Sequence, residues 1–411
     1  MFSWTVDCSA KPWSERFTVW PNPALRCRRG SVSITGNEDA GAGKKIGRGK
    51  SGPHEATSAS PCCDGRQENR AGLLERTKMI RAMTILLLSC TLGFCIAGCG
   101  KKRAAPQDGR FTIAVIPKGT IHEFWKTVHA GAEMAAQELH VQILWKGPLK
   151  EDDREAQMSV VENIITRGVA GIVLAPLDDA ALRGPVDRAM RSGIPVVIFD
   201  SGLQGDNYVS YVATDNFQAG QLAGQYMAKV LNGKGKVVVL RYAEGSDSTT
   251  QREDGFLDAI AAFETIEIVS SNQYAGVTTE SALRAAENLL SRFRRADGKL
   301  AINGIFCATE PTTLGILRAL QNTGHAGQIK FVGFDSSTKM IAALRTGELS
   351  GFIVQDPMKI GYLGVKTLVR HMRGEQVPRR IDTGSTLVTQ ENLDNPEIHA
   401  LLHPDLSKWL K

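Results

Sequence analysis

Apolar residues recur from about residue 110 onward in short runs that alternate with longer amphipathic segments. The runs are rich in Val and Ile and predict strands at residues 111–117, 141–145, 171–175, 194–199, 236–240, 266–269, 304–308, 329–334 and 351–354. Between most of them, apolar residues recur at spacings of three and four, which predicts helices. Strands that are apolar on both faces and are followed by amphipathic helices are typical of parallel sheets covered by helices.

The number of predicted strands is too large for one small sheet. A break at residues 214–216, Thr-Asp-Asn, precedes a second series of helices and strands. We therefore predict an α/β protein with two doubly wound parallel-sheet lobes of the Rossmann type. In such lobes, ligands bind beyond the carboxyl ends of the strands.

The composition of the whole chain conceals two unequal parts. The 411 residues carry a net charge of +6 and are 42% hydrophobic, values that exclude a wholly disordered chain or a polytopic membrane protein. Residues 1–98 hold 14 Lys and Arg against 8 Asp and Glu, whereas residues 99–411 hold 35 of each. The basic excess is therefore no indication of a nucleic-acid partner for the main body, and we expect none.

The cysteines divide in the same way. Seven of the eight lie at or before residue 99, and only Cys307 lies in the main body. We therefore expect neither a disulfide framework nor a zinc site there. Cys307 is predicted to be a small buried strand residue.

The first hundred residues contain one informative segment. Residues 1–78 show no persistent period and are predicted to be disordered or an over-extended start of the chain. Residues 79–98 have a basic start and then an uncharged apolar run that is short for a membrane span, as in a secretory signal. The end of the run, Ile-Ala-Gly before Cys99, resembles the lipobox of bacterial lipoproteins. The resemblance implies that Cys99 is lipid-modified and anchors the protein to a membrane; the alternative is a buried core helix.

Polar and aromatic residues follow several of the predicted strands. They are Lys118, His122, Phe124, Trp125, Asp200, Arg252, Thr309, Asp335 and Gln355. Carboxylates, a guanidinium and an amide supply the paired acceptors and donors that vicinal hydroxyls need, and adjacent aromatic rings supply flat faces for the C–H side of a sugar.

Several kinds of chemistry have no matching motif. No glycine-rich phosphate loop follows the first strand, and no Ser/His/Asp order or metal cluster stands at the strand ends. We therefore expect a binding protein, with no enzymatic activity, no cofactor and no metal.

From about residue 110 to 395, the chain resembles the bacterial periplasmic sugar-binding proteins of the ribose/galactose type. The resemblance rests on eight pieces in the family's order, among them GIPVVIFDSG, YVATDNFQAGQLAG, QREDGFLDAI and TLGILRALQ. It implies two lobes joined by three crossing segments. It also implies that the ligand is held by Phe124 and Trp125, by Asp200, by Arg252, and by Asp335 and Gln355.

The chain departs from the ribose-type pattern at three places. It has Asp200-Ser201 where Asp-Arg is usual, Thr309-Glu310 where Asn-Asp is usual, and His122-Glu123 where Asn-Pro precedes the aromatic pair. The ribose assignment is therefore not carried over. Lys118 and His122 are candidates to replace the missing donors, which would suit a differently decorated or acidic sugar.

Simpler structural roles remain open for the same residues. Phe124 could be a core residue of its helix, Asp200 and Asp335 could each cap a following helix, and Arg252 could form a surface ion pair.

The resemblance also implies an organisation of the chain. Residues 99–109 form a linker, residues 110–213 with 356–384 one lobe, residues 214–355 with 385–397 the other, and residues 398–411 a tail. We expect a monomeric, extracytoplasmic, lipid-anchored protein that binds a monosaccharide and delivers it to the permease of an ABC importer. A receptor subunit for a membrane sensor would have the same ligand chemistry, and a sugar-responsive repressor core would have the same fold.

Overall fold

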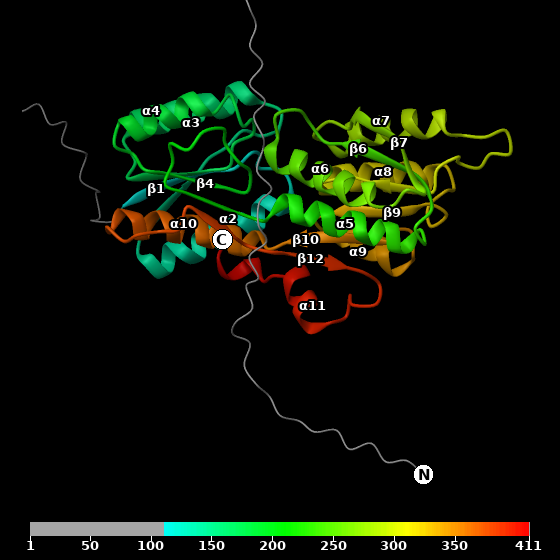
Figure 1. Cartoon of the computed structure of the whole chain (residues 1–411). Helices are drawn as coiled ribbons and strands as arrows, with labels where there is room; N and C mark the ends of the chain where they lie inside the picture. Colours follow the sequence, from blue (N-terminus) through cyan, green and yellow to red (C-terminus); the bar gives the residue numbers. More distant parts are fainter. Residues whose placement is uncertain (1–110, 411) are drawn as a thin grey trace, which may run out of the picture. The chain divides into compact units, whose positions relative to one another are not determined.

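The computed structural model describes residues 111–410, which form two lobes, each built on a six-stranded sheet. The strand order is β11-β5-β4-β3-β1-β2 in the first lobe and β12-β10-β9-β8-β6-β7 in the second. All pairings are parallel except that of β12 with β10, which is antiparallel. The predicted two-lobe, doubly wound fold is confirmed (Figure 1).

The first lobe combines an amino-terminal series of elements with two that return late in the chain. Its strands are β1 (Thr112–Ile116), β2 (Gln142–Trp145), β3 (Gly171–Leu174), β4 (Val196–Phe199), β5 (Ser210–Ala213) and β11 (Arg380–Asp382). Its helices are α2 (Glu123–Leu139), α3 (Arg154–Arg167), α4 (Arg183–Arg191) and α10 (Pro357–Met372). Figure 1 shows α3 and α4 above this sheet, and α2 and α10 below it.

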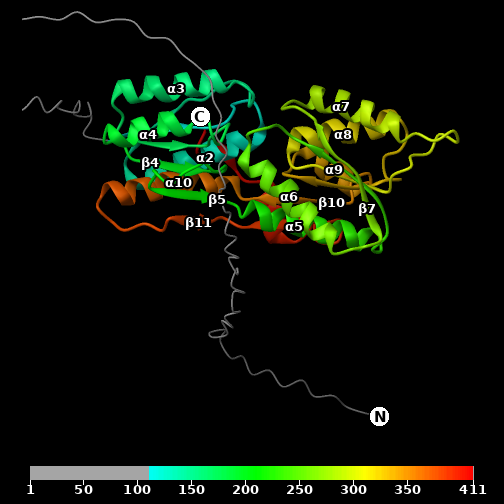
Figure 2. The same cartoon turned by 45° about the horizontal axis from the view of Figure 1, so that its top comes forward.

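The second lobe repeats this plan. Its strands are β6 (Gly235–Arg241), β7 (Ile266–Tyr274), β8 (Gly304–Phe306), β9 (Lys330–Phe334), β10 (Gly351–Gln355) and β12 (Ser385–Val388). Its helices are α5 (Asn216–Val230), α6 (Asp247–Ala261), α7 (Thr279–Arg292), α8 (Glu310–Asn322), α9 (Thr338–Arg345) and α11 (Pro396–Leu402), and a short 3₁₀ helix, η1 (Leu406–Lys408), follows. The chain passes between the two sheets three times: after β5, after β10 and after β11. Figure 2 shows the two lobes side by side.

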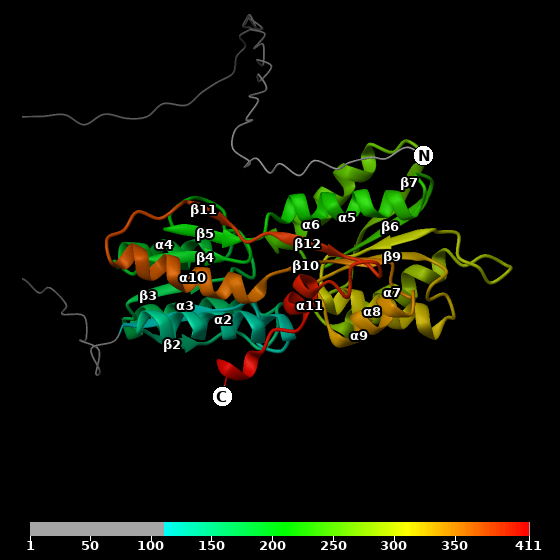
Figure 3. The ribbon, with the colours of Figure 1, turned by 90° about the horizontal axis from the view of Figure 1, so that it is seen from below.

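Alternation along each strand divides the core of each lobe into two layers. In β1, Ile113 and Val115 pack with α2 and α10, whereas Ala114 and Ile116 pack with α3 and α4. Both faces of the strand are therefore apolar because both are covered by helices. Figure 3 shows the close helix pairs α2 with α10 and α5 with α6.

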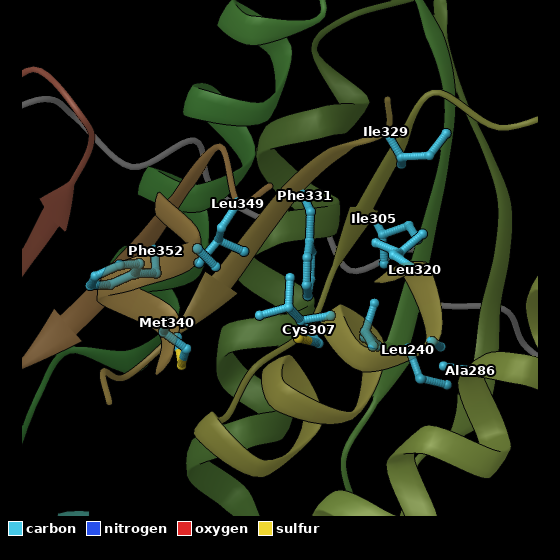
Figure 4. Close-up of a cluster of buried hydrophobic side chains, with 14 of the residues drawn as sticks. Leu240, Ala286, Ile305, Cys307, Leu320, Ile329, Phe331, Met340, Leu349 and Phe352 are labelled. Carbon is cyan, nitrogen blue, oxygen red and sulfur yellow. The ribbon is translucent and has the colours of Figure 1, made fainter. Parts of the chain in front are cut away.

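The largest buried cluster lies in the second lobe (Figure 4). It joins β-strand residues such as Ile305, Phe331 and Phe352 to α7, α8 and α9. Cys307 is buried within this cluster and forms no disulfide. Its predicted structural role is confirmed, although it lies just after β8.

Three strands were missed by the sequence prediction: β5, β11 and β12. They have only three or four residues each, and polar positions interrupt their apolar pattern. β11 and β12 are edge strands, so their pairing depends on a neighbour that the local sequence does not reveal.

The carboxyl-terminal tail predicted at residues 398–411 needs a correction. Its first residues belong to α11, and Ile398 and Leu402 are buried in the core of the second lobe. The two side chains are four residues apart and therefore share one face of the helix.

The predictions for residues 1–78, 79–98 and 99–109, including lipidation of Cys99, lie outside the described residues. Between residues 111 and 410, no helix has the length and apolar character that crossing a membrane requires.

Candidate ligand-binding site

One cavity between the two lobes is lined by all nine residues selected from the sequence. It has a volume of about 390 Å³, part of which is open to solvent. The nine come from the carboxyl ends of strands in both sheets, from the loops after them and from the helices that follow. The lining also includes residues that the sequence prediction did not select: Glu151, Tyr242, Ser248, Thr249, Glu310 and Pro311.

Two aspartates occupy equivalent positions in the two lobes. Asp200 follows β4 and Asp335 follows β9. β4 pairs with β5 and β9 pairs with β10, and β5 and β10 are strands after which the chain crosses to the other lobe. Both have a left-handed backbone, with φ of 64° and 61°. Asp adopts this conformation more readily than most residues, although at a cost. The strained turn directs each short carboxylate from the strand end into the cavity.

Lys118 connects Asp200 with the second lobe. Its ammonium nitrogen lies 3.6 Å from Asp200 Oδ2 and donates hydrogen bonds of 3.1 and 3.0 Å to the hydroxyl oxygens of Ser246 and Ser248. Burial raises the pKa of the Asp200 carboxyl, an effect that the positive charges of Lys118 and Arg252 partly offset. Lys118 therefore links the two lobes within the lining of the cavity.

Arg252 is held by the second lobe alone. Its side chain is 3% exposed, donates to Asn216 Oδ1 (2.8 Å) and to the carbonyl of Ala308 (2.9 Å), and stacks on the ring of Phe334. One terminal nitrogen lies 3.9 Å from Asp335 Oδ2. The surface ion pair considered as an alternative for Arg252 is therefore wrong.

Asp335 is also held by Gln355 and by the start of α8. The amide of Gln355 donates to Asp335 Oδ1 at 2.7 Å, and the backbone N–H of Glu310 donates to Oδ2 at 3.3 Å. Burial nevertheless raises the pKa of the Asp335 carboxyl. The residue that caps the following helix, α9, is Ser337.

The aromatic pair lies on the first lobe. Phe124 and Trp125 meet edge to face with ring centroids 5.0 Å apart, and Trp125 packs in turn on Phe199. Trp125 is 2% exposed and belongs to the core cluster under α2, whereas Phe124 is partly buried. Trp125 therefore serves both the core and the cavity wall.

Glu151 is the main residue that sequence reasoning missed on the first lobe. Its carboxylate accepts hydrogen bonds from the indole N–H of Trp125 (2.8 Å) and from the hydroxyl of Tyr242 on the second lobe (3.1 Å), and it lies 3.8 Å from His122 Nε2. Both residues could have been selected from the sequence as candidate site residues, because Glu151 follows the second predicted strand and Tyr242 follows the fifth.

Thr309 and Glu310 begin α8 at the wall that faces the first lobe. The Thr309 hydroxyl lies 2.9 Å from that of Thr312. Glu310 is 7% exposed, and within the part of the chain that the structure describes its Oε2 has no hydrogen-bond partner. Burial, reinforced by the negative charges of Asp335, Glu123 and Glu151, raises the pKa of Glu310 to about 8.

No group of three or more metal-ligating side chains occurs within residues 111–410. The carboxylates of Asp200, Asp335 and Glu151 lie beside cations or neutral donors, an arrangement suited to hydrogen bonding with a polar organic ligand. Two hinged parallel-sheet lobes with such a cavity between them define a two-lobe ligand-binding protein.

Residues 113–376 match the periplasmic binding protein domain family. The chain belongs to this family, in its ribose/galactose type. The ribose import binding protein of Haemophilus influenzae is 28% identical over 311 residues, which cover 76% of this chain and all of that protein.

Solved structures agree with this assignment. A carbohydrate transporter solute-binding protein from Agrobacterium radiobacter, in complex with D-arabinose, is 32% identical with a TM-score of 0.68, covering 72% of this chain and 99% of the other. An ABC transporter solute-binding protein from Agrobacterium vitis, with bound D-fucose, is 35% identical with a TM-score of 0.67, covering 71% and 100%.

Proposed function

We propose that the protein captures a monosaccharide between its two lobes and delivers it to an ABC-type sugar importer, as a monomeric extracytoplasmic solute-binding protein anchored through Cys99. The observation that carries this proposal is the cavity, in which acceptors, donors and an aromatic pair from both lobes line one space. Relatives described as binding arabinose, fucose and ribose support the ligand class.

The proposed mechanism is closure of the lobes around the sugar. We assign residues 111–213 and 356–384 to one lobe and residues 214–355 and 385–402 to the other, with the three crossings as the hinge. Direct contacts between the lobes, such as those from Lys118 to Ser246 and from Tyr242 to Glu151, correspond to the closed state. A ligand held from both sides favours that state, because only there does it contact both halves of the site.

Asp200 and Asp335 provide the most direct test. Asp200→Asn and Asp335→Asn keep the shape of the side chain and tolerate the left-handed backbone, but each removes a charged acceptor. Each variant is expected to bind sugar at least about tenfold more weakly, the scale of a lost charged hydrogen bond. Calorimetric titration with D-arabinose, D-fucose, D-tagatose, D-ribose and D-allose measures the effect.

Asp187→Asn is the matched control. Asp187 lies on α4, accepts from Asn207 and does not line the cavity, so its variant should bind like the wild type. The proposal fails if the wild type binds no monosaccharide, or if both cavity variants keep its affinity.

The anchor is tested separately from the ligand. Mass spectrometry of protein extracted from the native membrane should find the amino-terminal Cys99 with its acyl chains, and Cys99→Ser should release the protein into the soluble fraction. A Cys99 without lipid would remove the anchor from the proposal and leave sugar capture unaffected.

A further inference from the structure

The cavity is lined by more carboxyl groups than basic Lys and Arg side chains. Four carboxyl groups, those of Glu151, Asp200, Glu310 and Asp335, line it together with the side chains of Lys118 and Arg252. Lys118 lies beside Asp200 and Arg252 beside Asp335, so neither cation is left over for the two glutamates.

Glu151 is supported by neutral donors, whereas Glu310 is not. Glu151 accepts from Trp125 and Tyr242. Among the described residues, no group donates to Oε2 of Glu310, although that side chain is more than nine-tenths buried. A buried polar atom without a partner is costly, which makes it a place where a ligand gains specificity.

A second buried oxygen of the cavity also lacks a hydrogen-bond partner among the described residues. Oε1 of Gln355, whose side chain lines the same cavity, is buried and has no hydrogen-bond partner between residues 111 and 410. Both unsatisfied atoms are therefore acceptors when the Glu310 carboxyl is ionised. They call for a ligand that donates hydrogen bonds on the side of the second lobe.

The surroundings of Glu310 make this wall unfavourable for an anion. Asp335 acts on it from the end of β9, Glu123 from the start of α2, and Glu151 from the loop after β2. Lys126 of α2 opposes these negative charges. Lys118, considered above as a partner for an acidic sugar, is already bound to Ser246 and Ser248 and lies beside Asp200.

We propose that Glu310 is a specificity-determining residue of the cavity: its carboxyl group accepts a hydrogen bond from a hydroxyl or ammonium group of the ligand, and it excludes sugars that carry a carboxylate or a phosphate. The ligand class is thus neutral or amine-bearing sugars and polyols. This inference rests on the proposed sugar-binding function and narrows it.

The test compares sugars that differ in charge at one position. The first set is D-galactose, D-fucose, D-galacturonate and D-galactosamine, and the second is D-glucose, D-glucuronate and D-glucosamine. The third set is D-ribose and ribose 5-phosphate. Neutral D-arabinose, D-allose and D-tagatose are titrated as well. Each is titrated by calorimetry at pH 9, where a Glu310 carboxyl with a pKa of about 8 is ionised, into the wild type and into Glu310→Gln, which keeps the shape and an acceptor oxygen but removes the negative charge. Glu287→Gln, an exposed substitution on α7, is the matched control.

The wild type is expected to bind neutral or amino sugars and to bind their acidic counterparts at least about a hundredfold more weakly. Glu310→Gln should reduce discrimination against the acids, measured as the ratio of neutral-sugar to acidic-sugar affinity, by at least about tenfold. Thermal unfolding of both variants verifies that they are folded.

Two results overturn the inference: a wild type that prefers the acidic member of a set, or a Glu310→Gln variant with unchanged discrimination. Failure of every sugar to bind the wild type overturns the proposed function itself. The two failures are therefore distinguishable in one experiment.

Discussion

The two aspartates show how single residues are used in this site. Asp200 and Asp335 have a backbone conformation that most residues avoid, and both are preceded by a phenylalanine that is fully buried. Packing of Phe199 and Phe334 fixes the end of each strand, and the left-handed turn then directs the carboxylate outward. Strain is tolerated here because the surrounding core determines the turn.

Trp125 has two roles, and substitution should affect both. Trp125→Ala is expected to weaken sugar binding by more than about 1 kcal/mol, because a stacking surface is lost, and to lower the free energy of unfolding by about 3 kcal/mol, because a buried aromatic leaves a cavity. Calorimetry and denaturant unfolding measure the two effects. Trp145→Ala is the control: Trp145 stacks on His129 outside the cavity lining, so it should change stability alone.

Glu310 should make sugar affinity depend on pH. Burial and the carboxylates of Asp335, Glu123 and Glu151, with Lys126 opposing, raise its pKa to about 8, and we expect the pKa to return towards 4.5 when the lobes open and water solvates the carboxyl group. Because the pKa of Glu310 is higher in the closed state, its contribution to the free energy of closure is fully present below pH 4.5. That contribution is lost as the pH rises through about 8.

Affinity for a neutral sugar is therefore expected to fall between pH 5 and pH 9, by less than about tenfold per pH unit. Glu310→Gln should flatten that profile. Titrations across the range measure it, and an equally steep profile in the variant would contradict the assignment to Glu310.

At the scale of elements, α11 is the clearest addition to what was predicted. Its buried residues Ile398 and Leu402 extend the core formed by α9 and β10. After α11, His403 and Pro404 line a second cavity together with Phe124 of the first lobe. This short helix is therefore part of the second lobe and ends beside the cleft.

Leu402→Ala is expected to lower the free energy of unfolding by about 2 kcal/mol or more, because a buried leucine is replaced by a smaller side chain. Chemical denaturation measures the change. His403→Ala, at an exposed position, is the control and should have little effect. A stability equal to that of the wild type in Leu402→Ala would mean that α11 does not stabilise the lobe.

At the scale of the whole two-lobe unit, closure depends on close contacts between loops. The backbone N–H of Gly202, after β4, donates to Asp247 Oδ2 at the start of α6 (3.0 Å). A Cβ atom at residue 202 would lie 2.4 Å from that oxygen, a distance that real contacts do not allow. With alanine, the Asp247 carboxylate would have to turn away, and its hydrogen bond with the Gly202 N–H would be lost.

Gly202→Ala is expected to hinder closure without affecting the core of either lobe. Sugar affinity should fall by about tenfold or more, while thermal stability without sugar stays near that of the wild type. Small-angle scattering should show that sugar compacts the wild type but not the variant. Gly184→Ala is the control, because its Cβ would be 3.6 Å from the nearest atom, in ordinary contact. Wild-type affinity in Gly202→Ala would contradict the closed geometry.

Much of the site could be predicted because a parallel sheet brings the carboxyl ends of its strands to one edge. Residues immediately after a predicted strand, such as Asp200 and Asp335, could be chosen from sequence alone. Glu151 and Tyr242 also follow strands and were overlooked. Glu310 was noticed only as a departure from a family pattern, since its missing partner becomes visible only when the other lobe is in place.

The amino-acid sequence by itself determined the two-lobe α/β fold and most of the cavity residues. It could do so because the hydrophobic period identifies the elements locally, and because residue type identifies the chemistry at their ends. The pairing of β11 and β12, the burial of α11, the links from Lys118 and Glu151 across the cleft, and the charge balance around Glu310 required the tertiary structure. Each depends on groups far apart in the chain, and a contact, a burial cost or a Coulomb interaction depends on distance in space, which local sequence does not record.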